Sequence, residues 1–252
     1  MPPLYLHLLP MPVLGLGLYL GYIDGLGAAC AFCYLAWVFR GEALLPRWLW
    51  WSGGLLGGIA LAAHLLPGFQ PMLLWPARQL SSDAPPFALR LSWDKLLLGL
   101  ILLAWWLSRA RPLPQHGGLA ALIGVATLLL VPLLAMALGV VGWQPKWPQQ
   151  LWLWLAVNLG VAVLAEELLF RAWLQPVLVA SLGVARGVAL TALLFGAAHL
   201  PFSPLFALVA GVAGLGYGLV FHLSGRLWPA LLLHAAVNLT HLLLLSYPLR
   251  SA

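Results

Sequence analysis

Long apolar runs, separated by short polar breaks, make up most of this chain. A helix needs about 20 apolar residues to cross the hydrocarbon core of a bilayer, so these runs predict membrane helices. The runs 4–22 and 25–39 could also be one span followed by an interfacial segment. We therefore expect an all-α, polytopic transmembrane bundle of about eight or nine membrane segments. The apolar runs are 4–22, 25–39, 48–66, 96–107, 119–141, 151–174, 187–200, 204–223 and 227–245.

Composition agrees with a membrane protein and argues against several other classes. Of the 252 residues, 63% are hydrophobic and 7% are charged, whereas a soluble domain has about 25% charged residues. The formal charge of +6 comes from basic residues spread thinly over the breaks, so nucleic acid is not an expected partner. The cysteines, Cys30 and Cys33, lie in apolar surroundings without the βαβ context of a redox motif. We expect a multi-pass protein of the cell membrane (plasma or inner membrane), in contact with membrane lipid.

One apolar run carries charges that membrane helices rarely contain. The sequence Ala-Glu-Glu-Leu-Leu-Phe-Arg places Glu166, Glu167 and Arg171 within it. An ionised side chain at bilayer depth costs at least ~2.5 kcal/mol. Glu167 and Arg171 are four residues apart with the acid first, which is the favoured order for an ion pair on a helix. Glu166 projects about 100° away around the same helix, so this pair does not explain it, and we favour a functional role.

Two later runs carry isolated polar side chains at the same four-residue spacing. Phe195 and His199 share a face of one predicted helix, and His234 and Asn238 share a face of another. Each has a structural explanation by itself, because polar side chains of membrane helices often hydrogen-bond between helices. Taken together with Glu166, however, they supply a carboxylate base, two imidazoles and an amide donor, which suit peptide hydrolysis.

In this order, the motifs Glu-Glu-x-x-x-Arg, Phe-x-x-x-His and His-x-x-x-Asn resemble those of the CAAX-prenyl protease and bacteriocin-processing (ABI, CPBP) family of intramembrane proteases. The similarity covers about residues 150–245. Ala172 departs from the glycine that is common after the arginine in that family. The resemblance implies an intramembrane protease core at 150–245. Residues 1–145 are then lineage-specific N-terminal membrane helices, with an extramembrane loop at about 67–93.

The resemblance also implies a role for each of these side chains. Glu166 and His199 would activate a water molecule, and His234 and Asn238 would stabilise the oxyanion. The implied protein is an intramembrane endopeptidase that acts on a membrane-associated or lipidated peptide or protein substrate. The residues that would give structural support are Glu167, Arg171 and Phe195.

Three alternatives remain open from the sequence. Glu166, His199 and His234 could supply the two-histidine, one-carboxylate set of a catalytic zinc. No His-Glu-x-x-His motif is present and asparagine is a poor zinc ligand, so we favour a mechanism without a metal or other cofactor. A transporter that uses buried charges as an ion relay would show inverted repeats, which the sequence lacks. A binding or immunity-type protein of the same fold would lack protease activity and would tolerate the loss of Glu166 and His199.

Overall fold

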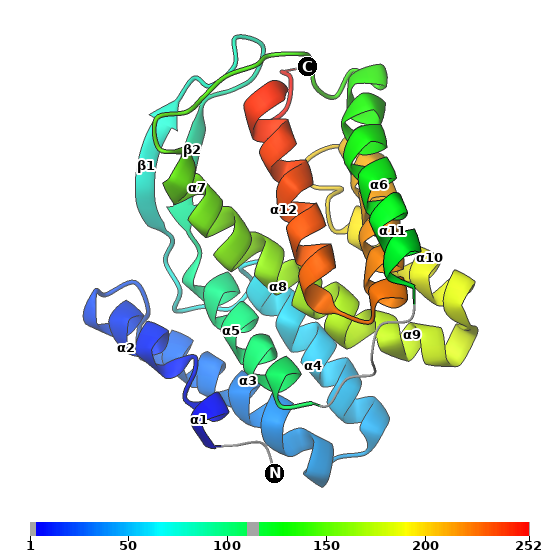
Figure 1. Ribbon diagram of the computed structural model, residues 1–252. Helices are drawn as coiled ribbons and strands as arrows, with labels where there is room; N and C mark the ends of the chain where they lie inside the picture. The colour runs from blue at the N-terminus through cyan, green and yellow to red at the C-terminus, as the bar shows by residue number, and fades with distance from the viewer. Residues whose placement is uncertain (1–3, 110–115, 252) are drawn as a thin grey trace. The chain divides into compact units, whose positions relative to one another are not determined.

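The computed structural model describes residues 4–109 and 116–251, and most of them are helical (Figure 1). The predicted helical class is therefore confirmed for most of the chain. The segments, in chain order, are α1 (Leu4–His7), α2 (Met11–Tyr19), α3 (Gly25–Leu44), α4 (Arg47–Ala62), β1 (Met72–Arg78), β2 (Phe87–Leu91), α5 (Trp93–Leu107), α6 (Gly117–Ala137), α7 (Leu151–Val157), the π-helical η1 (Asn158–Val163), α8 (Leu164–Glu167), the π-helical η2 (Leu168–Leu174), α9 (Gln175–Leu182), α10 (Val184–Ala197), α11 (Pro204–Ser224) and α12 (Leu227–Leu244).

A small β-sheet was not predicted by the sequence pattern. Strands β1 and β2 pair as a two-stranded sheet within the segment 67–93, for which we expected only an extramembrane loop. Pro76 within β1 argued against a strand, because proline removes a backbone donor. A two-stranded sheet consists entirely of edge strands, where that donor is dispensable.

Four of the described helices are long and apolar enough to cross a membrane, so the count of eight or nine segments is not confirmed. Helices α4 and α5 have 16 and 15 residues. At about 1.5 Å per residue, both are shorter than a hydrocarbon core of about 30 Å. Two further apolar helices, Tyr5–Tyr19 and Val184–Ala197, are also shorter than the four. The four candidate spans are Gly117–Ala137, Leu151–Leu182, Pro204–Ser224 and Leu227–Leu244.

The chain forms two compact units, which we call unit 1 and unit 2. The long helix Leu151–Leu182 contributes to both of them, and its middle part, with Glu166 and Glu167, belongs to unit 1. The predicted domains 1–145 and 150–245 were defined by the family resemblance and not by contacts within the structure, so they stay a prediction. Unit 1 comprises the described residues of Met1–Leu74, Arg90–Ala110 and Gly160–Leu169, and unit 2 those of Trp75–Leu89, Arg111–Leu159 and Phe170–Ala252.

In unit 1, helix α5 is the buried centre. It packs against α1, α2, α3, α4 and α8, and its Leu98, Leu102 and Ala104 are fully buried. This explains why so short a helix is so apolar: its neighbours, not lipid, cover most of it. Its first turn is held by Asp94, whose Oδ2 accepts a hydrogen bond from Nδ1 of His64 at 2.7 Å. The buried carboxylate thus has a partner, as a charge in apolar surroundings requires.

In unit 2, helix α11 packs against α6, α10 and α12. Its glycines make these contacts close, because small residues let helices approach each other. A Cβ atom on Gly214 would lie 2.9 Å from the ring of Phe195, and one on Gly216 would lie 2.1 Å from the Thr127 hydroxyl. Neighbouring side chains therefore occupy the space that larger residues on α11 would need.

Helices α10 and α11 also approach each other closely at Gly196. A Cβ atom on Gly196 would lie 2.7 Å from the carbonyl oxygen of Ala207 and 3.0 Å from the Cα of Gly211. We expect Gly196→Ala to reduce the free energy of unfolding by about 1–3 kcal/mol, because backbone atoms must move apart. Thermal unfolding of the purified protein in detergent should show a Tm several degrees lower, since about 1 kcal/mol corresponds to ~2–4 °C at this chain length.

Gly211→Ala is the matched control for this prediction. Its Cβ atom would lie 3.7 Å from the carbonyl oxygen of Ala192, an ordinary van der Waals contact. Alanine also favours a helix over glycine by up to about 1 kcal/mol, so the control should melt at or above the wild-type temperature. Equal melting temperatures for the two variants would contradict the close packing at Gly196.

Candidate active site

A small cavity inside unit 2 brings together His199, His234 and Asn238. The other side chains that line it, from α6, α10, α11, α12 and residues 140–141 and 245, are largely apolar. The space open to water is about 70 Å³. Because a cavity needs only ~10–15 Å³ of such space for one water molecule, this one has room for a few.

Phe195 determines the spacing of the two imidazoles in this cavity. Its ring is 2% exposed, and its centroid lies 4.8 Å from that of His199 and 5.7 Å from that of His234. The predicted helix 187–200 ends earlier, at Ala197, so His199 lies in the turn that follows α10. His199 Nδ1 is 2.8 Å from the carbonyl oxygen of Phe195. A carbonyl only accepts, so Nδ1 carries the proton and Nε2 keeps a lone pair that can accept one from water.

His234 is held between aromatic rings on the other side of the cavity. Its ring stacks on Tyr217 with a centroid distance of 4.6 Å and an interplanar angle of 18°, and the residue is only 5% exposed. Stacking fixes the plane of the imidazole, so its ring nitrogens point in defined directions. One turn further along α12, Asn238 lines the same cavity.

Asn158 orients this asparagine, and the sequence reasoning missed it. The Nδ2 group of Asn238 donates a hydrogen bond to Oδ1 of Asn158 at 3.4 Å. An amide nitrogen carries two N–H groups, so the second one stays available for an oxyanion. A signal was present, since Asn158 is an amide within an apolar run, eight residues before Glu166. Local spacing, however, does not connect it with a residue 80 positions away.

Arg171 supports the aromatic rings beneath the cavity. It is completely buried, and its guanidinium carbon lies 4.4 Å from the ring centroid of Phe195 and 5.4 Å from that of Tyr217. Its Nη2 group donates to the carbonyl oxygen of Gly214 at 3.3 Å. Each such cation–π contact contributes about 0.5–2 kcal/mol, more when it is desolvated. Arg171 thus holds the two rings that contact the imidazoles. The ion pair of Arg171 with Glu167, which belongs to unit 1 and is fully buried, stays a prediction.

Glu166 has a partner on a different helix. Within unit 1, its Oε1 lies 3.5 Å from Nζ of Lys95, and the two side chains are 18% and 23% exposed. The spacing rule for ion pairs on one helix connects only residues three or four positions apart, so it did not predict this pair. Glu166 belongs to unit 1, whereas His199 and His234 belong to unit 2, and its approach to them stays a prediction.

The two glutamates lie between two π-helical segments. A single turn, α8, carries Glu166 and Glu167, and it is flanked by η1 and η2. A π-helix bonds residues five apart instead of four, so side chains beyond it rotate away from the regular α-helical pattern. The i, i+4 rule used for Glu167 and Arg171 therefore does not hold strictly across η2. Such segments also occur frequently at functional sites.

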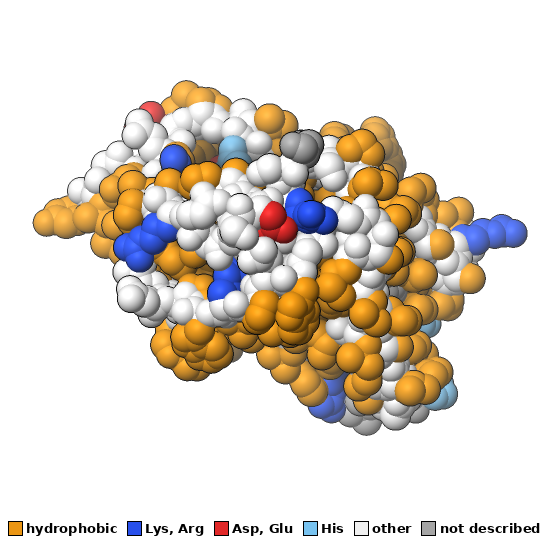
Figure 2. Space-filling view, turned by 90° about the horizontal axis from the view of Figure 1, so that it is seen from above, with side chains coloured by type: hydrophobic (Ala, Val, Ile, Leu, Met, Phe, Trp, Pro, Cys, Tyr) orange, Lys and Arg blue, Asp and Glu red, His pale blue; other side chains and the backbone are white. Residues whose placement is uncertain are grey.

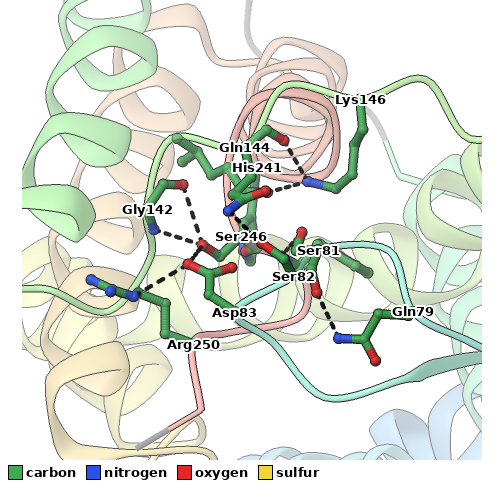
Figure 3. Close-up of polar contacts among 12 residues, drawn as sticks. Gln79, Ser81, Ser82, Asp83, Gly142, Gln144, Lys146, His241, Ser246 and Arg250 are labelled. Atoms are coloured by element: carbon green, nitrogen blue, oxygen red, sulfur yellow. Dashed lines mark hydrogen bonds and ion pairs between the residues drawn. The ribbon is translucent and has the colours of Figure 1, made fainter.

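A polar network adjoins the cavity at His241, which Figure 3 shows together with its partners. His241, which lines the cavity, donates from Nε2 to the carbonyl oxygen of Ser246 at 2.9 Å. The Ser246 hydroxyl accepts from the backbone N–H of Gly142 at 2.8 Å and donates to the Asp83 carboxylate at 2.7 Å. Arg250 Nε lies 3.3 Å from the same carboxylate. The network therefore ties together three segments of unit 2 that are far apart in the sequence.

This end of unit 2 is polar, and Figure 2 shows charged side chains there among uncharged polar atoms, with hydrophobic side chains around them. Lys146 Nζ donates to the carbonyl oxygens of Gln144 and Leu245. Burial lowers the pKa of Lys146, and the nearby Asp83 carboxylate partly opposes this effect. Burial also raises the pKa of Tyr247 to about 12, so its hydroxyl stays protonated at neutral pH.

The metal alternative can be compared with the side chains present. Within residues 4–109 and 116–251, no three His, Cys, Asp or Glu side chains form a group that could hold a metal ion. The amide of Asn238 lines the cavity one turn after His234, and it donates a hydrogen bond to Asn158. Amide N–H groups bind an anion well and a zinc ion poorly.

Comparison with known proteins identifies the segment that carries His199, His234 and Asn238. Residues 148–240 match the family model described as type II CAAX prenyl endopeptidase Rce1-like, and this stretch contains all three motifs. No curated protein and no solved structure matches the chain. The family and the apolar helices together support a membrane endopeptidase. Residues 148–240 of this chain are thus similar to the Rce1-like CAAX protease family.

Proposed function

We propose that this protein is a glutamate-type intramembrane endopeptidase. Its substrate is a membrane-associated or lipidated peptide or protein, and it works in the cell membrane as a multi-pass protein. The observation that carries the proposal is the small cavity in unit 2, where His199, which follows α10, meets His234 and Asn238 of α12. The similarity of residues 148–240 to the Rce1-like endopeptidase family supports the same reaction class.

The proposed reaction divides the chemistry among four side chains. Glu166 takes a proton from a water molecule while the water oxygen attacks the peptide carbonyl carbon. His199 orients this water through the lone pair on Nε2, which its Nδ1 bond to Phe195 leaves available. His234 and Asn238 donate hydrogen bonds to the oxyanion of the tetrahedral intermediate. The intermediate collapses, the C–N bond breaks, and the proton passes from Glu166 to the leaving amine.

Glu166→Gln tests the base. The amide keeps the size of the side chain but cannot accept the proton, so we expect no measurable cleavage by the purified enzyme in liposomes. Comparative proteomics of membranes should then show one or more uncleaved precursors that accumulate. Glu42→Gln is the matched control, because Glu42 is half-exposed and pairs with Arg109 in unit 1. It should behave as the wild type.

Two outcomes would overturn this assignment. Cleavage retained by Glu166→Gln would show that Glu166 is not the base. Ion flux through proteoliposomes that is lost in Glu166→Gln, together with no cleavage by the wild type, would establish the transporter alternative.

The amide pair gives a second prediction. Asn238→Ala should lower kcat about 10²–10³-fold with little change in KM, because an oxyanion donor acts mainly in the transition state. Asn158→Ala should lower kcat about fivefold to tenfold, the effect of one hydrogen bond of about 1 kcal/mol. Because Asn158 acts through Asn238, the double variant should be no slower than Asn238→Ala alone. Additive losses would show that the two residues act independently.

Metal dependence is the third prediction. A reaction that relies on Glu166 and hydrogen-bond donors should proceed at the same rate after extended treatment with a strong chelator. Activity would be measured on the same preparation before treatment, after it, and after addition of zinc. Loss of activity that zinc restores would replace this mechanism with the zinc-dependent version through Glu166, His199 and His234.

A further inference from the structure

We propose that Lys95 is a positioning residue for Glu166, and that the N-terminal helices thereby supply the counter-charge of the general base. Lys95 lies outside residues 148–240, the part of the chain that the family model matches. The inference rests on the proposed function, since it concerns the same glutamate.

The first observation is the contact itself. Lys95 Nζ lies 3.5 Å from Glu166 Oε1, and less than a quarter of either side chain is exposed. In such a partly dehydrated site an opposite charge is attracted more strongly than it is at an open surface. A nearby cation also favours the ionised carboxylate, which is the form that accepts a proton from water.

The second observation is that the backbones of α5 and α8 lie close together. Helix α5 packs directly against α8 within unit 1. Gly99, one turn after Lys95 on the same face, lies against this segment, because its Cβ atom would be 3.5 Å from the backbone nitrogen of Ala165. The close approach brings the long lysine side chain within reach of the carboxylate.

The third observation is that the first turn of α5 is anchored. Asp94 is 3% exposed and binds His64 through Oδ2, while its Oδ1 accepts from the backbone N–H of Lys95 at 2.9 Å. The Lys95 backbone is thus fixed, and only the flexible stem of the side chain remains to be ordered.

The acidic residues beside Lys95 and Glu166 indicate why the positive charge of Lys95 matters for Glu166. Glu167 is next to Glu166 in the chain, and Asp94 is next to Lys95, so each member of the pair has an acidic neighbour in the sequence. Without the lysine, neighbouring carboxylates would favour protonation of Glu166. A protonated Glu166 cannot act as a base.

The test compares Lys95→Gln with Lys95→Arg in the reconstituted enzyme. In Lys95→Gln, the acid limb of the pH profile of kcat/KM should move to higher pH by about one unit, so kcat/KM at pH values on that limb should fall about tenfold. KM should stay within about twofold, because Lys95 acts on the base and not on substrate binding. Lys95→Arg keeps the charge and should restore the wild-type profile. An unchanged pH profile in Lys95→Gln would overturn the inference.

A stability measurement tests the pair independently of catalysis. Lys95→Gln should lower the Tm because it leaves the carboxylate without this cation, and Lys95→Gln/Glu166→Gln should recover most of that loss. Failure of the double variant to recover the loss would overturn the pairing, even if Lys95→Gln folds too poorly for an assay. The outcomes also separate the two proposals. An active Glu166→Gln overturns both, whereas an inactive Glu166→Gln with a wild-type pH profile in Lys95→Gln overturns only the role of Lys95.

Discussion

Phe195 contacts both imidazoles of the cavity, the ring of Tyr217 and the guanidinium of Arg171. Its ring fits because Gly214 on α11 has no side chain, and a Cβ atom there would lie 2.9 Å away. One aromatic ring thus links the packing of α10 on α11 to the spacing of the two histidines. The cavity depends on this contact, since a shift of Phe195 would move the groups that line it.

Charges in the apolar parts of the structure are compensated one by one. Arg171 has aromatic faces and a carbonyl oxygen, Asp94 has His64, and Glu166 has Lys95. Burial makes an uncompensated charge expensive, so these contacts restrict how the helices can pack. The same restriction serves chemistry, because a held carboxylate and a held imidazole need little reorganisation during a reaction.

The size of the cavity indicates which reactant of the proposed enzyme it can hold. About 70 Å³ is enough for a few water molecules but not for a peptide segment. The cavity therefore suits the storage and orientation of the hydrolytic water. Largely apolar side chains line it, and His241 connects it with the polar network of Asp83 and Ser246. The similarity of residues 148–240 to the family model supports an endopeptidase acting at the membrane.

The sequence alone determined the membrane character, the helical class and the three motifs. Each of these follows from short-range chemistry: the length of apolar runs, the spacing of side chains on a helix, and charges in apolar surroundings.

Tertiary structure decided the contacts between residues that are far apart in the chain, which the spacing of side chains on one helix does not predict. Lys95 meets Glu166 from 71 positions away, and Asn158 meets Asn238 from 80 positions away, because helices pack side by side regardless of their order in the chain. The π-helical segments beside the glutamates and the short sheet within 67–93 also depend on neighbours that a local pattern does not contain. The burial of short helices such as α5 has the same reason, because packing against neighbouring helices and not hydrophobicity alone decides how much of their surface protein covers.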